Sequence, residues 1–185
     1  VLPQACIAPA AIDPYNSTPM QLVNRRYRPL EYFQELLDAM PALDAFILHA
    51  YTHGPSVSAI TSLTPFADFM TDHYFDFQTY RQFMERIPAR WKQVPVIIGE
   101  TNHLCRAPGA PGCEDSAQEG WINANINWVR AVYQEIHRWN SIPYIQQIHG
   151  VLLYRWSGDQ WELHNKDQIL LDFTQAMGND YRWRS

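Results

Sequence analysis

Four short runs of apolar residues recur along the chain. Within each run the apolar positions are nearly continuous instead of alternating with polar ones, which is typical of strands that are covered on both faces in a parallel sheet. The runs lie at residues 5–12 (ACIAPAAI), 44–51 (DAFILHAY), 94–100 (VPVIIGE) and 150–156 (GVLLYRW). We therefore predict four buried strands at these positions.

After each run, apolar residues recur at the three- and four-residue spacing of amphipathic helices. Pro29 lies near the start of the first such segment and Pro88 ends the second, as proline does at helix boundaries. Ser116 followed by Glu119 forms a capping-box pattern, which predicts the start of the third helix. The predicted helices span residues 28–43, 77–91, 116–140 and 166–177. The alternation predicts a single α/β domain over residues 1–185, with four βα units, right-handed crossovers and a parallel sheet.

Polar and aromatic side chains gather where the predicted strands end. His49 and Tyr51 end the second strand, and Glu100 and Asn102 end the third. Residues two apart on a strand share one face, and α/β proteins place ligands at the carboxyl ends of their parallel strands. The long loops 52–76 and 102–117 leave the same ends, and loops of that length are usually functional or disordered. We expect a site there.

The succession PAAIDPYN, FILHAYTHG, PVIIGETN and GVLLYRW resembles strands five to eight of a clan A glycoside hydrolase, which is a (β/α)8 barrel. The resemblance implies that Glu100, in its apolar-Gly-Glu context, is the catalytic nucleophile of a retaining glycosidase. His49 and Tyr51 would orient this carboxylate, and Trp156 would stack beneath the sugar. Asn102, two residues beyond Glu100, is a further candidate for substrate binding. The chain would form half of a TIM barrel, act on a carbohydrate and need no cofactor or metal.

The family's acid/base glutamate follows an asparagine at the end of the fourth strand, and no strand of this chain ends in Asn-Glu. A retaining glycosidase needs two carboxyl groups about 5–5.5 Å apart, one to attack and one to protonate the leaving oxygen. Four acidic residues in or near the strand-end loops could substitute, and no pattern distinguishes Glu114, Glu119, Asp159 and Glu162. A half-barrel also exposes sheet edges and an apolar face. We therefore expect an N-terminal half-barrel in a larger parent protein, or a homodimer.

Composition narrows the classes of partner. The net charge of −5, the pI near 5.7 and the lack of any basic run argue against nucleic acid. No apolar stretch approaches the roughly 20 residues of a membrane span. The aromatic content of 14% suits either core packing or a surface that stacks on sugar rings.

The three cysteines suggest one disulfide. Cys105 and Cys113 bracket the Pro/Gly-rich loop RAPGAPG, which can bring its ends together. The alternative is two unpaired thiols. A disulfide would suit an extracellular or cell-envelope location. Cys6 lies in an apolar run and is expected to be buried.

Two other functions remain open. The first is a non-catalytic carbohydrate-binding or structural half-barrel, in which Glu100 accepts hydrogen bonds from sugar hydroxyls. The second is a metal-dependent barrel hydrolase that uses His49, His53 and His103. Residues four apart on a strand are about 13 Å apart, so His49 and His53 could share an ion only if the chain turned between them. The sequence holds no GxSxG elbow, Walker loop or dinucleotide fingerprint.

Overall fold

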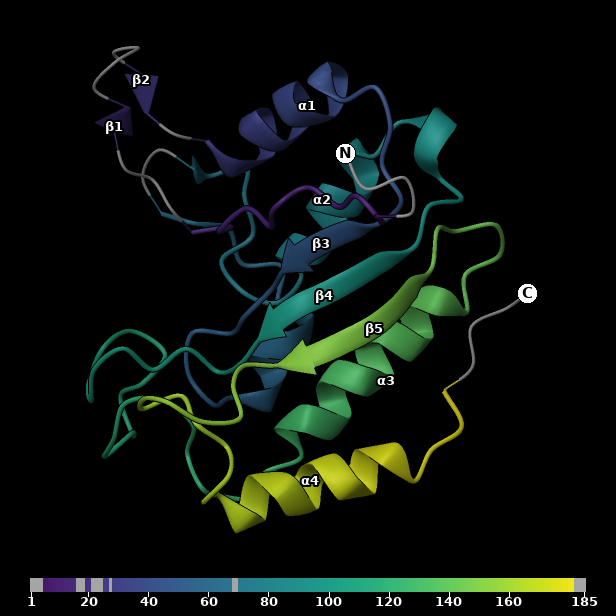
Figure 1. Ribbon diagram of the computed structural model, residues 1–185. Coiled ribbons are helices and arrows are strands. Elements are labelled where there is room, and N and C mark those ends of the chain that lie inside the picture. Colours follow the sequence, from purple (N-terminus) through teal and green to yellow (C-terminus); the bar gives the residue numbers. More distant parts are fainter. Residues whose placement is uncertain (1–4, 16–18, 21–24, 27, 68–69, 182–185) are drawn as a thin grey trace.

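The computed structural model describes residues 5–15, 19–20, 25–26, 28–67 and 70–181. The described chain is a mixed α/β domain with a small parallel sheet of three strands and four α-helices (Figure 1). The sheet order is β3 (Phe46–His49), β4 (Val96–Thr101) and β5 (Ile148–Leu153), with β4 in the centre. A short antiparallel pair, β1 (Pro19–Met20) and β2 (Arg25–Arg26), forms a separate hairpin. The carboxyl ends of β3, β4 and β5 therefore lie at one edge of the sheet.

The first predicted strand is not formed. Residues 5–12 are all described, and none of them is in a strand. The segment runs beside the start of β3, where the Asp44 N–H donates to the Ile7 carbonyl and the Ile7 N–H donates to the Asp44 carboxylate, both at 2.7 Å. Pro9 has no N–H to donate, and the alanines around it bury little apolar surface, so this run does not sustain a ladder. The prediction of a strand there is wrong.

The four helices are shorter than predicted. They are α1 (Pro29–Ala39), α2 (Thr79–Arg86), α3 (Trp128–Asn140) and α4 (Asp167–Met177). Pro29 is the first residue of α1, and α2 ends just before Pro88, after which residues 89–91 form a single 3-10 turn. Both proline boundaries are confirmed.

The predicted start of the third helix at Ser116 is wrong. The Ser116 hydroxyl instead accepts a hydrogen bond from the Gln118 N–H at 3.3 Å, within a local turn. Asn127, just before α3, has a left-handed backbone with φ of 66°. The start of α3 is held from outside, because the Asp172 carboxylate of α4 accepts the Val129 N–H at 2.8 Å. A buried acid on a neighbouring helix thus satisfies one of the N–H donors in the first turn of α3, which have no partner within the helix.

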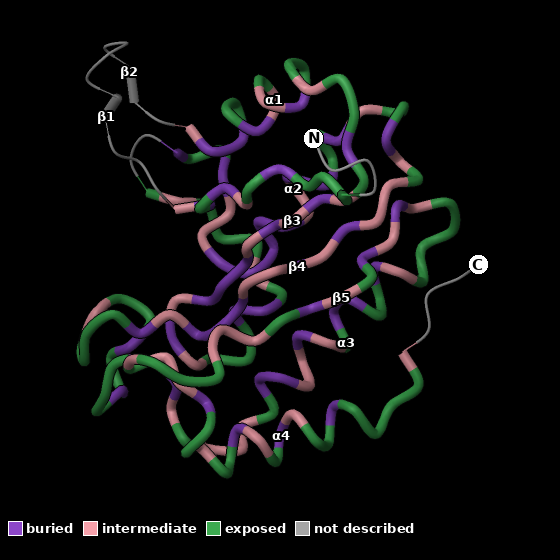
Figure 2. The backbone as a smooth tube through the Cα atoms, viewed as in Figure 1, coloured by how far each residue is buried: buried purple, intermediate pink, exposed green. Residues whose placement is uncertain are grey.

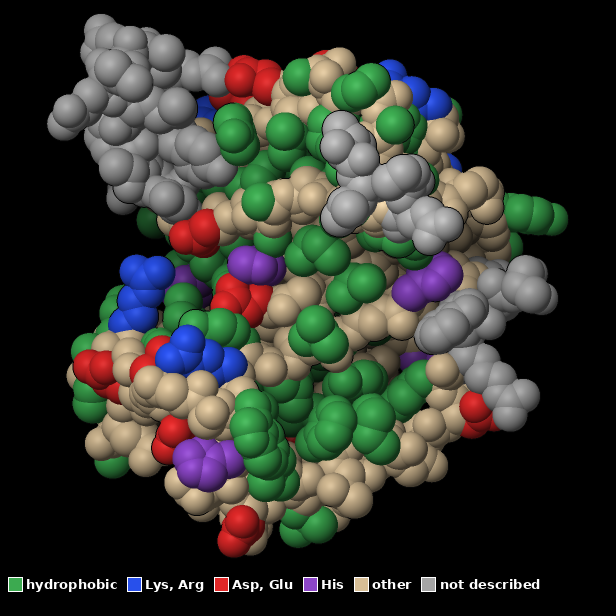
Figure 3. Space-filling view, in the orientation of Figure 1, with side chains coloured by type: hydrophobic (Ala, Val, Ile, Leu, Met, Phe, Trp, Pro, Cys, Tyr) green, Lys and Arg blue, Asp and Glu red, His purple; other side chains and the backbone are tan. Residues whose placement is uncertain are grey.

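The helices pack on one face of the sheet, and the other face is left uncovered by helices (Figures 1 and 2). Alternate residues of β3 and β4 are buried against the helices (Phe46 and Leu48, Val96 and Ile98), and in β5, where the register shifts, Ile148 and Val151 are buried. On the opposite face Leu152 is 56% exposed. Hydrophobic side chains gather in the middle of the surface seen in Figure 3. Parallel sheets are normally covered on both faces, so this open face is unusual.

Side chains of α3 satisfy part of the outer edge of β5. The Asn140 amide donates to the Ile148 carbonyl at 2.8 Å, and its oxygen accepts the Ile148 N–H at 2.9 Å. The Tyr133 hydroxyl donates to the Val151 carbonyl at 3.0 Å. These contacts shield peptide groups that an edge strand would otherwise leave open for pairing. No described helix has the length and hydrophobicity to cross a membrane.

Candidate functional site

Glu100 lies near the end of β4, where the strand pairing slips. Leu48 pairs with Ile98, but the next residue of β3, His49, pairs with Glu100, so Gly99 is skipped. Gly99 and Glu100 are both partly exposed, whereas the preceding residues of β4 alternate between buried and partly exposed. A bulge of this kind re-aims side chains at the end of a strand. It turns Glu100 away from the helix-covered face and brings it beside His49.

Two side chains, those of Tyr51 and His49, contact the Glu100 carboxylate. The Tyr51 hydroxyl donates to Oε2 of Glu100 at 2.5 Å. Nδ1 of His49 lies 3.0 Å from the same oxygen and 3.1 Å from the Tyr51 hydroxyl. The Glu100 side chain is 20% exposed and that of His49 is 23% exposed, so the group is shielded from bulk water but not sealed. The structure therefore brings together three of the predicted site residues.

The surroundings favour an ionised Glu100. Burial alone would raise the pKa of its carboxyl group, but the hydrogen bonds from His49 and Tyr51, with the electrostatic effects of His49 and Arg155, lower the pKa below its ordinary value. Burial and the bond to Glu100 raise the pKa of Tyr51 far above its ordinary value, so this phenol stays a neutral donor. Glu100 is therefore a charged hydrogen-bond acceptor, and the Tyr51 hydroxyl is its uncharged donor.

A cavity of about 190 Å³ opens beside this group at the carboxyl ends of the strands. Its walls come from the segment before β1 and from the loops that follow β3, β4 and β5. The lining residues are Asp13, Tyr15, Tyr51, Glu100, Asn102, Leu104, Arg106, Tyr154, Asp159 and Trp161. The cavity is small and is lined by carboxylates and by aromatic rings. Carboxylates accept hydrogen bonds from sugar hydroxyls, and aromatic rings stack on the faces of sugars.

Two predicted binding residues lie differently with respect to this cavity. Asn102 lines it and is 1% exposed. The Asn102 amide donates weakly to the Tyr154 carbonyl at 3.5 Å, and its buried Oδ1 has no hydrogen-bond partner among the described residues. Trp156 is not part of the lining and is 64% exposed, beyond the end of β5. Tyr154 and Trp161 provide aromatic walls in its place.

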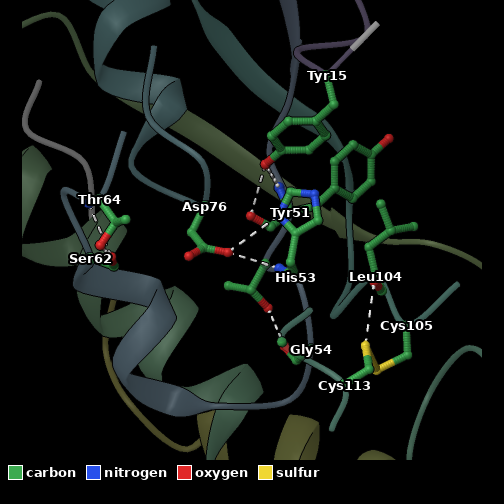
Figure 4. A network of polar contacts seen from close by, with 12 residues as sticks. Tyr15, Tyr51, His53, Gly54, Ser62, Thr64, Asp76, Leu104, Cys105 and Cys113 are labelled. Carbon is green, nitrogen blue, oxygen red and sulfur yellow. Dashed lines mark hydrogen bonds and ion pairs between the residues drawn. A yellow bond between two sulfur atoms is a disulfide. The ribbon is translucent and has the colours of Figure 1, made fainter. Parts of the chain in front are cut away.

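The predicted disulfide between Cys105 and Cys113 is confirmed, with Cα atoms 5.7 Å apart. It closes the loop that carries Arg106, a lining residue of the cavity. The same loop packs against the chain that follows β3, because a Cβ atom on Gly112 would lie only 2.0 Å from the His53 carbonyl oxygen. Figure 4 shows the disulfide close to this segment. The bond is compatible with an extracellular location. Cys6, expected to be buried, is exposed.

Several lining residues escaped the sequence analysis. Asp13 and Tyr15 lie just beyond the predicted strand at residues 5–12, and Arg106 follows a loop cysteine without any motif. Of the four acids considered as substitutes for the acid/base, only Asp159 lines the cavity. The Asp-Pro-Tyr sequence after an apolar run is a local signal for the turn that the chain makes at residues 14–15.

The three histidines of the metal alternative do not converge. His53 stacks on Phe75 with ring centroids 3.7 Å apart. His103 is fully buried between tryptophans, and burial lowers its pKa to about 3. Among the described residues no group of three or more His, Cys, Asp or Glu side chains is arranged to hold a metal ion. The geometry therefore gives this alternative no support.

Comparison with protein-family models finds no match, and neither do comparisons with curated proteins and with solved structures.

Proposed function

We propose that this chain carries the nucleophile half of a retaining glycosidase site, with Glu100 as the attacking carboxylate. The observation that supports the proposal is the arrangement at Glu100, where an ionised carboxylate is held by the Tyr51 hydroxyl at 2.5 Å and by His49 at 3.0 Å beside a cavity. In a double displacement the carboxylate must be charged and correctly oriented before it attacks the anomeric carbon. The lowered pKa and the two hydrogen-bond partners serve these two requirements.

The proposed reaction divides the roles among few residues. Glu100 forms the bond to the anomeric carbon while the leaving oxygen departs, and water later releases the sugar from Glu100. Tyr51 keeps one carboxylate oxygen engaged, which leaves the other free to attack. Asn102, Tyr154 and Trp161 line the space that the sugar would occupy.

The described cavity offers no convincing acid/base. Asp159 is already paired with Arg155, whose guanidinium lies 3.1 Å from its carboxylate, so it is a poor source of a proton. Asp13 is exposed and accepts the Tyr15 N–H at 2.9 Å. We therefore propose that the second carboxyl comes from outside this chain, either from an N-terminal half-barrel of a parent protein or from a second copy.

The fold is consistent with half of a (β/α)8 barrel. Three parallel strands carry helices on one face, and residues 5–12 lie beside β3, where a further strand would be placed. The open face, with Leu152 exposed, would be the barrel interior. We propose that the parent protein acts outside the cytoplasm, as the Cys105–Cys113 disulfide suggests.

The test uses a β-glucoside and a β-cellobioside that carry fluorine next to the anomeric carbon and a dinitrophenolate leaving group. Dinitrophenolate departs without a proton, so labelling does not require the missing acid. We expect intact-mass analysis to show one covalent sugar, mapped by peptide digestion to Glu100. The Glu100→Gln variant is the matched control and should remain unlabelled.

The carbohydrate-binding alternative predicts a different result with the same reagents. Saturable binding of the sugars, without covalent labelling of the native chain, would support a lectin-like role and contradict catalysis. Labelling at another carboxylate, such as Asp159, would place the nucleophile elsewhere. Absence of both binding and labelling would contradict both functions for these two sugars.

A further inference from the structure

Tyr15 makes two hydrogen bonds to the backbone of Tyr51. Its hydroxyl donates to the Tyr51 carbonyl at 3.0 Å and accepts the Tyr51 N–H at 3.3 Å. The two rings also touch, with centroids 5.7 Å apart (Figure 4). One phenol thus satisfies both peptide groups of the residue whose side chain binds Glu100.

The position of Tyr51 explains why these two bonds matter. The residues on either side of it continue the pairing with β4, because Ala50 N–H donates to the Glu100 carbonyl and Thr52 N–H donates to the Asn102 carbonyl, both at 3.1 Å. The peptide groups of Tyr51 face away from β4, where a regular sheet would supply another strand. Buried peptide groups need partners, and here a side chain replaces the strand.

Tyr15 is itself held firmly. Its ring meets the His53 ring edge-on at 4.7 Å, and His53 stacks on Phe75. The backbone N–H of His53 donates to the Asp76 carboxylate at 2.8 Å. Figure 4 shows Tyr15, His53 and Asp76 side by side next to Tyr51. The hydroxyl of Tyr15 is therefore a fixed point and not a mobile contact.

We propose that Tyr15 is a positioning residue for the Glu100 site: by holding the Tyr51 backbone, it keeps the Tyr51 hydroxyl directed at the Glu100 carboxylate. The proposal deepens the proposed function, since it matters for catalysis only if Glu100 reacts. The physical link itself does not depend on catalysis. Loss of the Tyr15 hydroxyl should loosen the Tyr51 phenol, weaken its bond to Glu100 and make the carboxylate easier to protonate.

The experiment measures the pKa of Glu100 by NMR, from the chemical shift of its ¹³C-labelled carboxyl carbon, with the signal assigned through Glu100→Gln. Tyr51→Phe removes a hydrogen-bond donor that stabilises the charged carboxylate, so the pKa of Glu100 should rise. We expect a rise of about one pH unit, because the partial exposure of the site weakens the contribution of this bond. Tyr15→Phe, which leaves the Tyr51 hydroxyl in place, should raise the pKa by a measurable part of that shift.

Tyr133→Phe is the matched control. The Tyr133 hydroxyl also donates to a backbone carbonyl, that of Val151, at the same distance of 3.0 Å, but on the edge of β5 away from the cavity. This variant should leave the Glu100 titration unchanged. A purely structural loss of a tyrosine hydroxyl would affect Tyr15→Phe and Tyr133→Phe alike, and that equality would overturn the proposal. A Glu100 titration in Tyr15→Phe that coincides with the native one would overturn it as well.

A second measurement on the native chain covers the case in which Tyr15→Phe fails to fold. The Tyr51 amide hydrogen should exchange with solvent slowly, because the Tyr51 N–H donates a hydrogen bond to the Tyr15 hydroxyl. Exchange as fast as that of an exposed amide would show that the bond is not made, and would overturn the proposal. The glycosidase proposal is tested separately by covalent labelling, so either proposal can fail while the other stands.

Discussion

Replacing Glu135 with glutamine tests how a buried charge joins two helices. The Glu135 carboxylate on α3 is 2% exposed and accepts four hydrogen bonds. The donors are Gln78 at 2.9 Å, Tyr80 at 2.9 Å, Arg81 at 2.6 Å and Arg138 at 2.8 Å. Glu135→Gln keeps the shape of the side chain, but it removes the charge and turns one acceptor into a donor that faces other donors.

The expected loss of stability depends on which of these hydrogen bonds are shielded from solvent. Arg138 is 59% exposed, so its bond to Glu135 contributes little. The bonds from Tyr80 and Arg81 are to a charged acceptor, and bonds of this kind contribute about 1.5–3 kcal/mol each. Removing one partner from a buried ionic group usually costs about 3–5 kcal/mol. We expect Glu135→Gln to lower the free energy of unfolding by about 3–4 kcal/mol.

The effect should depend on pH. Burial would raise the pKa of Glu135, but the hydrogen bonds from Gln78, Arg81 and Tyr80 lower it below its ordinary value. Because the folded pKa lies below the unfolded value of about 4.3, the carboxylate adds stability above that pH. This stability is lost as the pH falls through the folded pKa.

Urea unfolding of both proteins at pH 7, and then at steps below pH 5, measures the difference directly. The difference in the free energy of unfolding between the native protein and Glu135→Gln should be largest at pH 7 and should decrease on acidification. Glu119→Gln, at an exposed position, is the control and should change little at any pH. A gap below about 1 kcal/mol at pH 7, the size of a single ordinary hydrogen bond, would refute this reasoning. A difference in the free energy of unfolding that does not decrease in acid would refute the inference that the charge of Glu135 stabilises the fold.

Three further predictions concern the loop, the sheet edge and the open face. Replacing Cys105 and Cys113 with serine should lower the free energy of unfolding by about 2.5 kcal/mol, because the disulfide closes a short loop and so reduces the entropy of the unfolded chain. Chemical denaturation would measure this loss. A cost near zero would contradict that. Asn140→Ala uncovers the Ile148 peptide groups at the edge of β5, so light scattering should show more association than for the native chain. Unchanged scattering would show that the edge is protected in another way. Because one sheet face is open, the isolated chain should dimerise or aggregate in sedimentation experiments, and a clean monomer at all concentrations would count against this.

The sequence predicted the elements that have strong periodic patterns. Three of the four predicted strands and all four predicted helices overlap an observed strand or helix, because buried apolar runs and amphipathic stripes are local signals. The run at residues 5–12 failed, since continuous hydrophobicity does not reveal that Pro9 and its alanine neighbours make a poor ladder. The start of α3 failed because its partner, Asp172, lies on the next helix and leaves no local trace.

The site was only partly predictable, for a related reason. Glu100, His49 and Tyr51 stand at strand ends, which a sequence pattern can mark. Tyr15 acts through contacts 36 residues away, and such long-range pairs have no signature in a single sequence. Trp156 is the last residue of the predicted strand at 150–156, but the strand ends at Leu153. The loop that follows β5 then brings Trp161 to the cavity instead.

The bulge at Gly99 determines which way the Glu100 side chain points. With regular alternation along β4, Glu100 would point to the helix-covered face, where a lone carboxylate is costly. The skipped residue is a glycine, and a Cβ there would lie 2.5 Å from the Ile47 side chain. The bulge interrupts the ladder, leaves Glu100 partly exposed and places the next residue, Thr101, in the buried face. The bulge thus avoids the burial of a lone carboxylate against the helices and brings Glu100 to its two partners, the Tyr51 hydroxyl and His49.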